Sequence, residues 1–305
     1  MVECPSVGTG MITRVTELTP RPSRSDTREA IELRALRERQ PELAGAIDMH
    51  LELLEVQRRV QGRIPLPSFE VSIDILSLHQ SKARPLLRFE DIPLALTDLR
   101  LVVRQTADIM RRFGALEGDD CRRVQVVGRE EGLIERIATW YRVCAEARAD
   151  VPRTAPASAE READGHLLDQ VFMLAMRPFL CRCAEVLQPC SELSTWTHAH
   201  CPLCGGEPDF SVITPAAERH LICSRCALQW KFEALTCPYC GNRDRSRITS
   251  FATPDGRYRV YGCDACTRYL KAYDARRASR PVMPVMDSIA TLPLDAAAIQ
   301  RGYSS

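Results

Sequence analysis

The chain has 305 residues, of which 45% are hydrophobic and 27% are charged, and its formal net charge is +1. This composition is typical of a soluble globular protein with one or two domains. The balanced charge favours neither nucleic acid nor an acidic membrane surface as a partner. No apolar stretch reaches the roughly 18–20 residues that a membrane-spanning helix needs.

Residues 1–20 lack the charged start and the apolar stretch of a signal peptide, so we expect a cytoplasmic protein. The chain contains 14 cysteines. In a reducing compartment, cysteines bind metals or remain free thiols more often than they form disulfides.

Residues 1–195 are predicted to form a mainly α-helical domain. Apolar residues recur at helical spacing, and Pro178 is expected to kink the last helix. Two stretches without such spacing, 62–67 and 150–165, are predicted to be a turn and a loop. We expect a bundle of five to seven helices, including segments near 41–54, 92–110, 133–144 and 167–184.

Downstream, short β-branched or aromatic segments alternate with cysteine pairs and predict strands at 219–222, 228–232, 248–252 and 258–261. Helical spacing returns at 288–303. The predicted fold class is an N-terminal helical bundle followed by two tandem rubredoxin-like or zinc-ribbon modules joined end to end. The predicted boundaries are 1–195 for the helical domain, 196–235 and 236–280 for the two modules, and 281–305 for a C-terminal segment with a short helix.

Eight cysteines form four Cys-x-x-Cys pairs within 66 residues: Cys201 and Cys204, Cys223 and Cys226, Cys237 and Cys240, and Cys263 and Cys266. Two intervening residues let a tight turn aim both sulfurs at one point. Two such turns supply a tetrahedron of thiolates, which suits zinc or a single iron. Glycine follows the first and third pairs, where it relieves crowding as the chain curls around a metal.

The lengths between successive pairs are 18, 10 and 22 residues. Each longer segment can hold a hairpin, so we pair 201/204 with 223/226 and 237/240 with 263/266. An interleaved pairing remains an alternative. His198 and His200 flank the first pair, but eight cysteines already fill two tetrahedra, so we do not expect either histidine to be a ligand.

The sequence shows no pattern typical of an active site. A saturated Cys4 centre leaves no open position for water or substrate, which argues against metal-dependent hydrolysis. A Gly-rich phosphate loop and a Gly-x-Ser-x-Gly elbow are both absent. We therefore predict no catalytic residue and no enzyme.

The order of motifs resembles the formate dehydrogenase accessory proteins of the FdhE type. The resemblance rests on Cys-Pro-Leu-Cys-Gly-Gly at 201–206, Leu-Ile-Cys-Ser-Arg-Cys-Ala-Leu-Gln-Trp at 221–230, Cys-Pro-Tyr-Cys-Gly-Asn at 237–242, Cys-Asp-Ala-Cys-Thr-Arg-Tyr-Leu-Lys at 263–271, and the ending from Asp287 to Tyr303. These motifs cover about the last hundred residues. The chain looks shorter at its C-terminal end than the longer members of the family.

The resemblance implies a cytoplasmic maturation factor needed for active respiratory formate dehydrogenase. It implies that the protein contacts the catalytic subunit before export. Family members resemble rubredoxin in binding iron, and the eight paired cysteines match their metal ligands. Two metal ions are therefore expected, with iron favoured and zinc possible, and self-association remains open.

Two alternatives have a basis in the same residues. One is a zinc-ribbon nucleic-acid-binding protein, because arginines lie among tyrosines between residues 243 and 269. The charge of residues 197–280, with 13 Lys+Arg against 8 Asp+Glu, gives it little support once two anionic metal centres are added. The other is a rubredoxin-like electron carrier, which does not account for a large helical domain.

Overall fold

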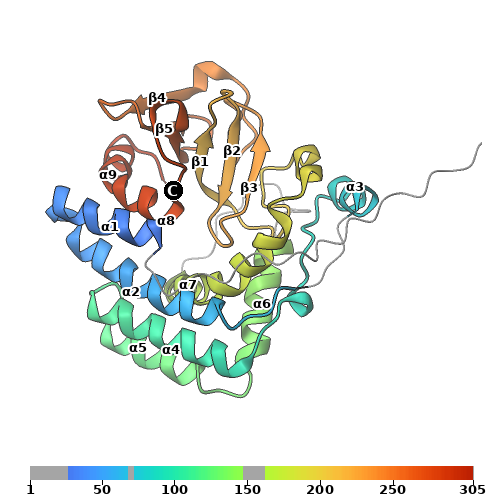
Figure 1. Ribbon diagram of the computed structural model, residues 1–305, viewed down its shortest axis with the longest axis vertical. Helices are drawn as coiled ribbons and strands as arrows, with labels where there is room; N and C mark the ends of the chain where they lie inside the picture. The colour runs from blue at the N-terminus through green and yellow to red at the C-terminus, as the bar shows by residue number, and fades with distance from the viewer. Residues whose placement is uncertain (1–26, 68–71, 147–161, 305) are drawn as a thin grey trace, which may run out of the picture.

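A computed structural model describes residues 27–67, 72–146 and 162–304. Figure 1 shows a layer of helices with a β-sheet above it and two C-terminal helices beside the sheet. The helices are α1 Arg28–Arg39, α2 Ala44–Gln61, α3 Ile73–Ser81, α4 Leu96–Arg112, α5 Gly118–Val127, α6 Leu133–Glu146, α7 Glu162–Leu187, α8 Pro284–Ala290 and α9 Leu292–Gln300. The strands are β1 Pro208–Ile213, β2 Arg219–Cys223, β3 Gln229–Phe232, β4 Ile248–Ala252, β5 Tyr258–Cys263 and β6 Tyr269–Asp274.

Helices α2, α4 and α7 pack against one another and form the centre of the helical part. Amphipathic spacing explains α4, whose buried side carries Leu99, Val103 and Met110. Side-chain caps start two of the shorter helices: the Thr27 hydroxyl accepts from Ala30 N, and the Ser72 hydroxyl accepts from Ile75 N. The described ranges contain seven α-helices before residue 195, as the sequence predicts.

Some helix boundaries differ from the prediction. Helix α7 begins at Glu162, inside the segment predicted to be a loop, and continues through Pro178 to Leu187. Residues 150–161 of that segment, and residues 1–20, lie outside the described residues. The predicted helix at 288–303 is divided at Thr291 into α8 and α9.

The six strands form one sheet in the order β3-β2-β1-β6-β5-β4. Each cysteine-rich half contributes three antiparallel strands, and the halves join where β1 pairs in parallel with β6. The two halves therefore meet edge to edge as well as following one another along the chain. The four predicted strands are all present, which confirms the fold class, whereas the domain boundaries stay a prediction.

The sequence prediction omitted both strands of the central parallel pair. Strand β1 begins with a proline and carries Asp209, and β6 carries Lys271 and Asp274, so neither shows simple alternation. All six residues of β6 are nevertheless buried. Ion pairs with residues of other elements make the burial of Lys271 and Asp274 possible.

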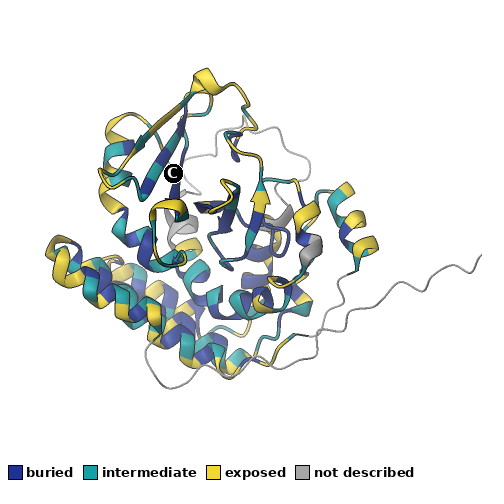
Figure 2. Cartoon of the chain, turned by 45° about the horizontal axis from the view of Figure 1, so that its top comes forward, coloured by how far each residue is buried: buried dark blue, intermediate teal, exposed yellow. Residues whose placement is uncertain are grey.

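The C-terminal helices tie the end of the described chain to its beginning. Leu33 and Leu36 of α1 pack with Met286 and Ile289 of α8. The Glu29 carboxylate accepts hydrogen bonds from the N–H groups of residues 285 and 286 at the start of α8. Figure 2 shows the buried faces turned inward between the helices and the sheet. No described helix combines the length and the apolar character that a membrane-spanning segment requires.

Candidate metal centres

All four Cys-x-x-Cys pairs form the same backbone turn. In the first, Gly205 N donates to Cys201 O at 3.0 Å, and Cys201 N donates to Gly206 O at 2.9 Å. The other three turns, at 223–228, 237–242 and 263–268, repeat both hydrogen bonds. The residue after the second cysteine has a positive φ every time: Gly205, Ala227, Gly241 and Thr267.

This repeated geometry explains the glycines after the first and third pairs, since glycine adopts positive φ without strain. Ala227 and Thr267 adopt the same conformation with φ of 56° and 57°. Because neither residue is a glycine, residue type alone does not indicate the turn at these two positions. Their position directly after the second cysteine of a pair does indicate it.

The turns bring the eight cysteines into two clusters. Cys201, Cys204, Cys223 and Cys226 form the first cluster, and Cys237, Cys240, Cys263 and Cys266 form the second. Within each cluster the four sulfurs lie within 4.8 Å of one another. The structure therefore has the consecutive pairing that the spacing favours, and not the interleaved one.

The sulfur separations fit a tetrahedral metal. A metal–sulfur bond of about 2.3 Å requires neighbouring sulfurs to be about 3.8 Å apart. In the first cluster, Cys201 Sγ and Cys226 Sγ are 3.5 Å apart, and Cys204 Sγ and Cys226 Sγ are 3.7 Å apart. In the second, the Cys237–Cys266 and Cys240–Cys263 Sγ separations are both 3.7 Å. Each cluster can hold one metal ion.

Burial raises the pKa of four of the eight thiols. It raises the pKa of Cys201 and Cys226 well above the usual value, and that of Cys237 to about 11. Burial also acts on Cys240, but hydrogen bonds from the Asn242 N–H and the neighbouring thiols lower its pKa. Metal binding must release protons from the buried thiols, so affinity for metal rises with pH.

The histidines near the clusters have other contacts. His198 Nε2 lies 2.7 Å from Gln80 O, and its ring stacks on His200 with the centroids 5.3 Å apart. His220 Nε2 lies 3.6 Å from a carboxylate oxygen of Glu218. None of the three belongs to either cysteine cluster, as expected for the first two.

Arginines that the sequence did not single out contact the cysteine turns. Arg177 of α7 donates to Ser224 O at 2.9 Å, and the Arg225 guanidinium lies 4.5 Å from the ring centroid of Trp140 in α6. Arg219 of β2 donates to Thr236 O, next to Cys237. These roles could not be inferred from sequence, because each depends on a contact between residues that are distant along the chain.

Two of the three tyrosines that suggested base stacking have internal roles. Tyr258 and Tyr269 are 7% and 6% exposed, and their hydroxyls donate to Asp287 and Asp295. Neither ring presents a free face for stacking nucleic-acid bases. The C-terminal motif that contains both aspartates therefore holds α8 and α9 against the sheet.

Comparisons with known proteins identify relatives of part of this chain. A family model described as "FdhE, central domain" matches residues 200–233. "Protein FdhE homolog" from Shewanella oneidensis is 33% identical over 109 residues, and the homolog from Aquifex aeolicus is 30% identical over 117 residues. These matches cover 34% and 37% of this chain and 35% and 41% of the relatives. The chain thus spans little more than a third of the length of the curated relatives that it matches.

A solved structure extends the likeness to the whole fold. The crystal structure of the FdhE protein from Pseudomonas aeruginosa matches with a TM-score of 0.59, over 93% of this chain and 95% of that chain. The sequence identity is 18%, so this match speaks for a shared architecture.

Proposed function

Because the chain is an FdhE-family protein, we propose that it is an accessory protein for formate dehydrogenase and that its eight paired cysteines hold two metal ions. The observation that carries the proposal is the pair of four-cysteine clusters built into one sheet, in a fold shared with FdhE. On this proposal the protein works in the cytoplasm and binds the catalytic subunit before that subunit is exported.

Iron is the metal that we propose, on the resemblance to rubredoxin-like family members. The four thiolates of each cluster accept tetrahedral iron or zinc with similar geometry. Metal analysis and a visible absorption spectrum distinguish the two. Thiolate-to-iron bands support the proposal, whereas a colourless protein with two zinc ions contradicts the assignment of iron.

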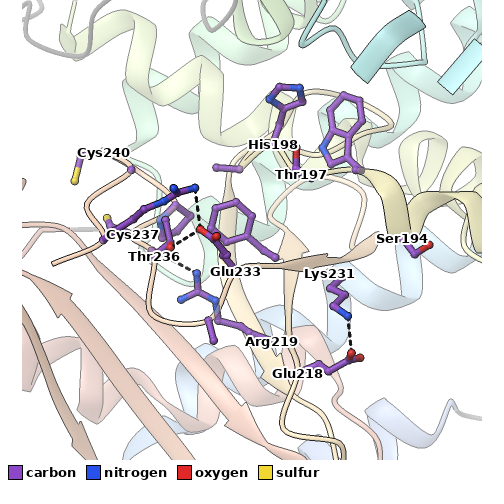
Figure 3. A pocket seen from close by; sticks show the side chains of 17 residues that line it. Ser194, Thr197, His198, Glu218, Arg219, Lys231, Glu233, Thr236, Cys237 and Cys240 are labelled. Atoms are coloured by element: carbon purple, nitrogen blue, oxygen red, sulfur yellow. Dashed lines mark hydrogen bonds and ion pairs between the residues drawn. The ribbon is translucent and has the colours of Figure 1, made fainter. Parts of the chain in front are cut away.

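The binding site that we propose for the catalytic subunit is a cleft of about 1210 Å³ beside the second cluster. We call it the knuckle cleft; its lining includes Thr197 and His198 at the end of the helical part, Lys231 of β3, and Cys237 and Cys240. Figure 3 shows the cysteine turn and β3 facing this space. Because three separate parts of the fold line the cleft, a segment bound there would contact all of them.

Capture of the catalytic subunit tests the proposal. We expect the tagged protein to co-purify with the formate dehydrogenase catalytic subunit, and we expect Arg243→Glu to reduce capture at least fivefold. Arg243 lines the cleft, its side chain is 76% exposed, and it pairs with Glu233. Charge reversal there changes the electrostatic match with a bound segment.

Arg122→Glu is the matched control. Arg122 lies on α5, its side chain is 75% exposed, and it also pairs with one acidic residue, Asp119. We expect capture by this variant to equal that of the wild type. Equal loss in both variants would refute the cleft as the binding site, and failure of the wild type to capture the subunit would refute the accessory function.

A further inference from the structure

The two cysteine clusters differ in their exposure to solvent. In the first cluster, the four cysteines are between 0% and 1% exposed. In the second, Cys237 and Cys263 are buried, Cys266 is half-buried and Cys240 is exposed. Of the eight cysteines, Cys240 alone lies outside the main hydrophobic core and its partly buried margin. Both clusters have the same turns, so the difference comes from what packs around them.

The helical part encloses the first cluster. Its first turn is fixed by backbone hydrogen bonds from a loop of the helical part, in which Leu86 N donates to Pro202 O at 2.8 Å and Leu87 N donates to Leu203 O at 2.9 Å. Its second turn is held at Ser224 O by Arg177. Each of its four cysteines is therefore no more than 1% exposed, although Cys223 and Cys226 border cavities.

The second cluster has an open side. Cys237, Cys240 and Gly241 line the knuckle cleft, and a Cβ placed on Gly241 would meet no atom within 4 Å. Figure 3 shows Cys240 at one edge of the view of this cleft and Lys231 of β3 on the opposite side. A small molecule or an extended segment in the cleft can therefore reach the Cys240 sulfur without unfolding the protein.

We propose that the second cluster is an exchange centre, which gives up or accepts its metal through Cys240, and that the first cluster is a permanent structural centre. The exchanging ligand is a thiol or another soft donor that enters the knuckle cleft. An entering thiol loses its proton as its sulfur replaces that of Cys240 at the metal, and the Cys240 thiolate gains a proton. Because a cysteine of a bound partner could act in this way, the centre is suited to passing metal to, or holding, a cysteine-containing client segment.

This inference rests on the proposal that both clusters bind metal. The number of bound ions tests that occupancy, and the rates at which the ions leave test the exchange. The full-length protein is loaded with two Zn(II) ions and mixed with excess EDTA, and native mass spectrometry counts the bound metal over time. We expect one ion to leave at least tenfold faster than the other. In parallel, iodoacetamide labelling with peptide mapping should modify Cys240 before any cysteine of the first cluster.

Two variants assign the phases. Cys240→Ser should remove the fast phase of metal release and leave the slow phase. Cys266→Ser changes a less exposed ligand of the same cluster. It should also remove the fast phase, but it should leave Cys240 reactive toward iodoacetamide. Release of two ions at one rate, or first labelling at Cys201, Cys204, Cys223 or Cys226, overturns the inference. Failure of the wild type to bind two ions overturns the metal sites themselves.

Discussion

The ammonium of Lys271 and the carboxylate of Asp295 form an ion pair of 2.7 Å that joins the central strand β6 to helix α9. The two side chains are only 8% and 18% exposed. Lys271 also donates to Ser288 O at 3.2 Å, so both hydrogen-bond partners of its ammonium belong to the C-terminal segment. A lysine can occupy the middle of this sheet because α9 supplies its counter-charge.

Asp295→Asn should therefore destabilise the fold strongly. Removing one partner of a buried pair leaves an uncompensated charge and costs about 3–5 kcal/mol. Glu55→Gln, which breaks the exposed Arg59–Glu55 pair, is the control and should cost less than about 1 kcal/mol. Urea unfolding of the metal-loaded proteins measures both, and equal costs would contradict the structural role assigned to Asp295.

Gly262→Ala should detach the C-terminal tail from the sheet. A Cβ at residue 262 would lie 2.5 Å from the Tyr303 ring, so the ring must move, at a cost of about 1–3 kcal/mol. Hydrogen exchange should accelerate at Tyr269 N, which donates to Ser304 O at 3.1 Å. Gly45→Ala, in open space on α2, makes the same chemical change and should leave that exchange rate unaltered.

Asp209 should make the protein less stable as pH rises from about 4 to 6. Desolvation by the surrounding protein raises the pKa of Asp209 from 3.8 to about 6, although the residue is exposed and lines a cavity of about 130 Å³ together with Arg177 and His50. The folded chain thus keeps a proton that the unfolded chain has lost, and the slope of stability against pH is negative in this window. Because Asp209 is exposed, solvent screening reduces the effect to about 1 kcal/mol.

Asp209→Asn removes this proton difference. The variant should match the wild type below pH 4 and exceed its stability by about 1 kcal/mol at pH 7. Burial also lowers the pKa of His50, which lines the same cavity. The difference between the two unfolding curves isolates Asp209, because His50 is present in both proteins. Parallel curves across pH 4–7 would contradict the shift.

Arg219 should strengthen the second metal centre from the other half of the sheet. Its side chain is buried and donates a hydrogen bond to the carbonyl of Thr236, directly before Cys237. Burial lowers the pKa of Arg219 to about 10, because the nearby acidic groups offset only part of the cost of removing the guanidinium from water. A Cys4–metal centre is anionic, so binding a metal at the second cluster improves the surroundings of this guanidinium.

Arg219→Met should weaken metal binding at the second cluster about 10- to 100-fold, the range found when groups that orient metal ligands are removed. Chelator competition measures the change, and the first cluster provides an internal reference that should remain constant. Arg219→Lys keeps the charge and should lose less affinity. An equal effect on both clusters would indicate general destabilisation instead.

The local features of the metal centres were predictable from the sequence. A spacing of two residues between cysteines specifies the turn, and the segment lengths between pairs leave room for hairpins, so the clusters and four strands follow from short-range information. The parallel pairing of β1 with β6 was not predictable from the sequence. Strand β6 contains Lys271, and a lysine can be buried in this strand only because Asp295, on a helix further along the chain, pairs with it.

The unequal exposure of the clusters was also beyond the sequence. Cys204 and Cys240 occupy equivalent positions in the same turn, and both precede a glycine. One is buried because a helical part packs around it, and the other is exposed because its turn borders the knuckle cleft. Such a difference arises from tertiary packing alone.

The parallel junction of β1 and β6 has a consequence for synthesis of the chain. Ser211 of β1 reaches its partner Lys271 across 60 residues of sequence, so during translation β1 emerges long before β6 can cover it. An apolar strand edge that waits unpaired is a site for aggregation. The nascent chain therefore has a vulnerable interval, and chaperone cover or early metal supply during that interval should determine how much soluble protein a cell obtains.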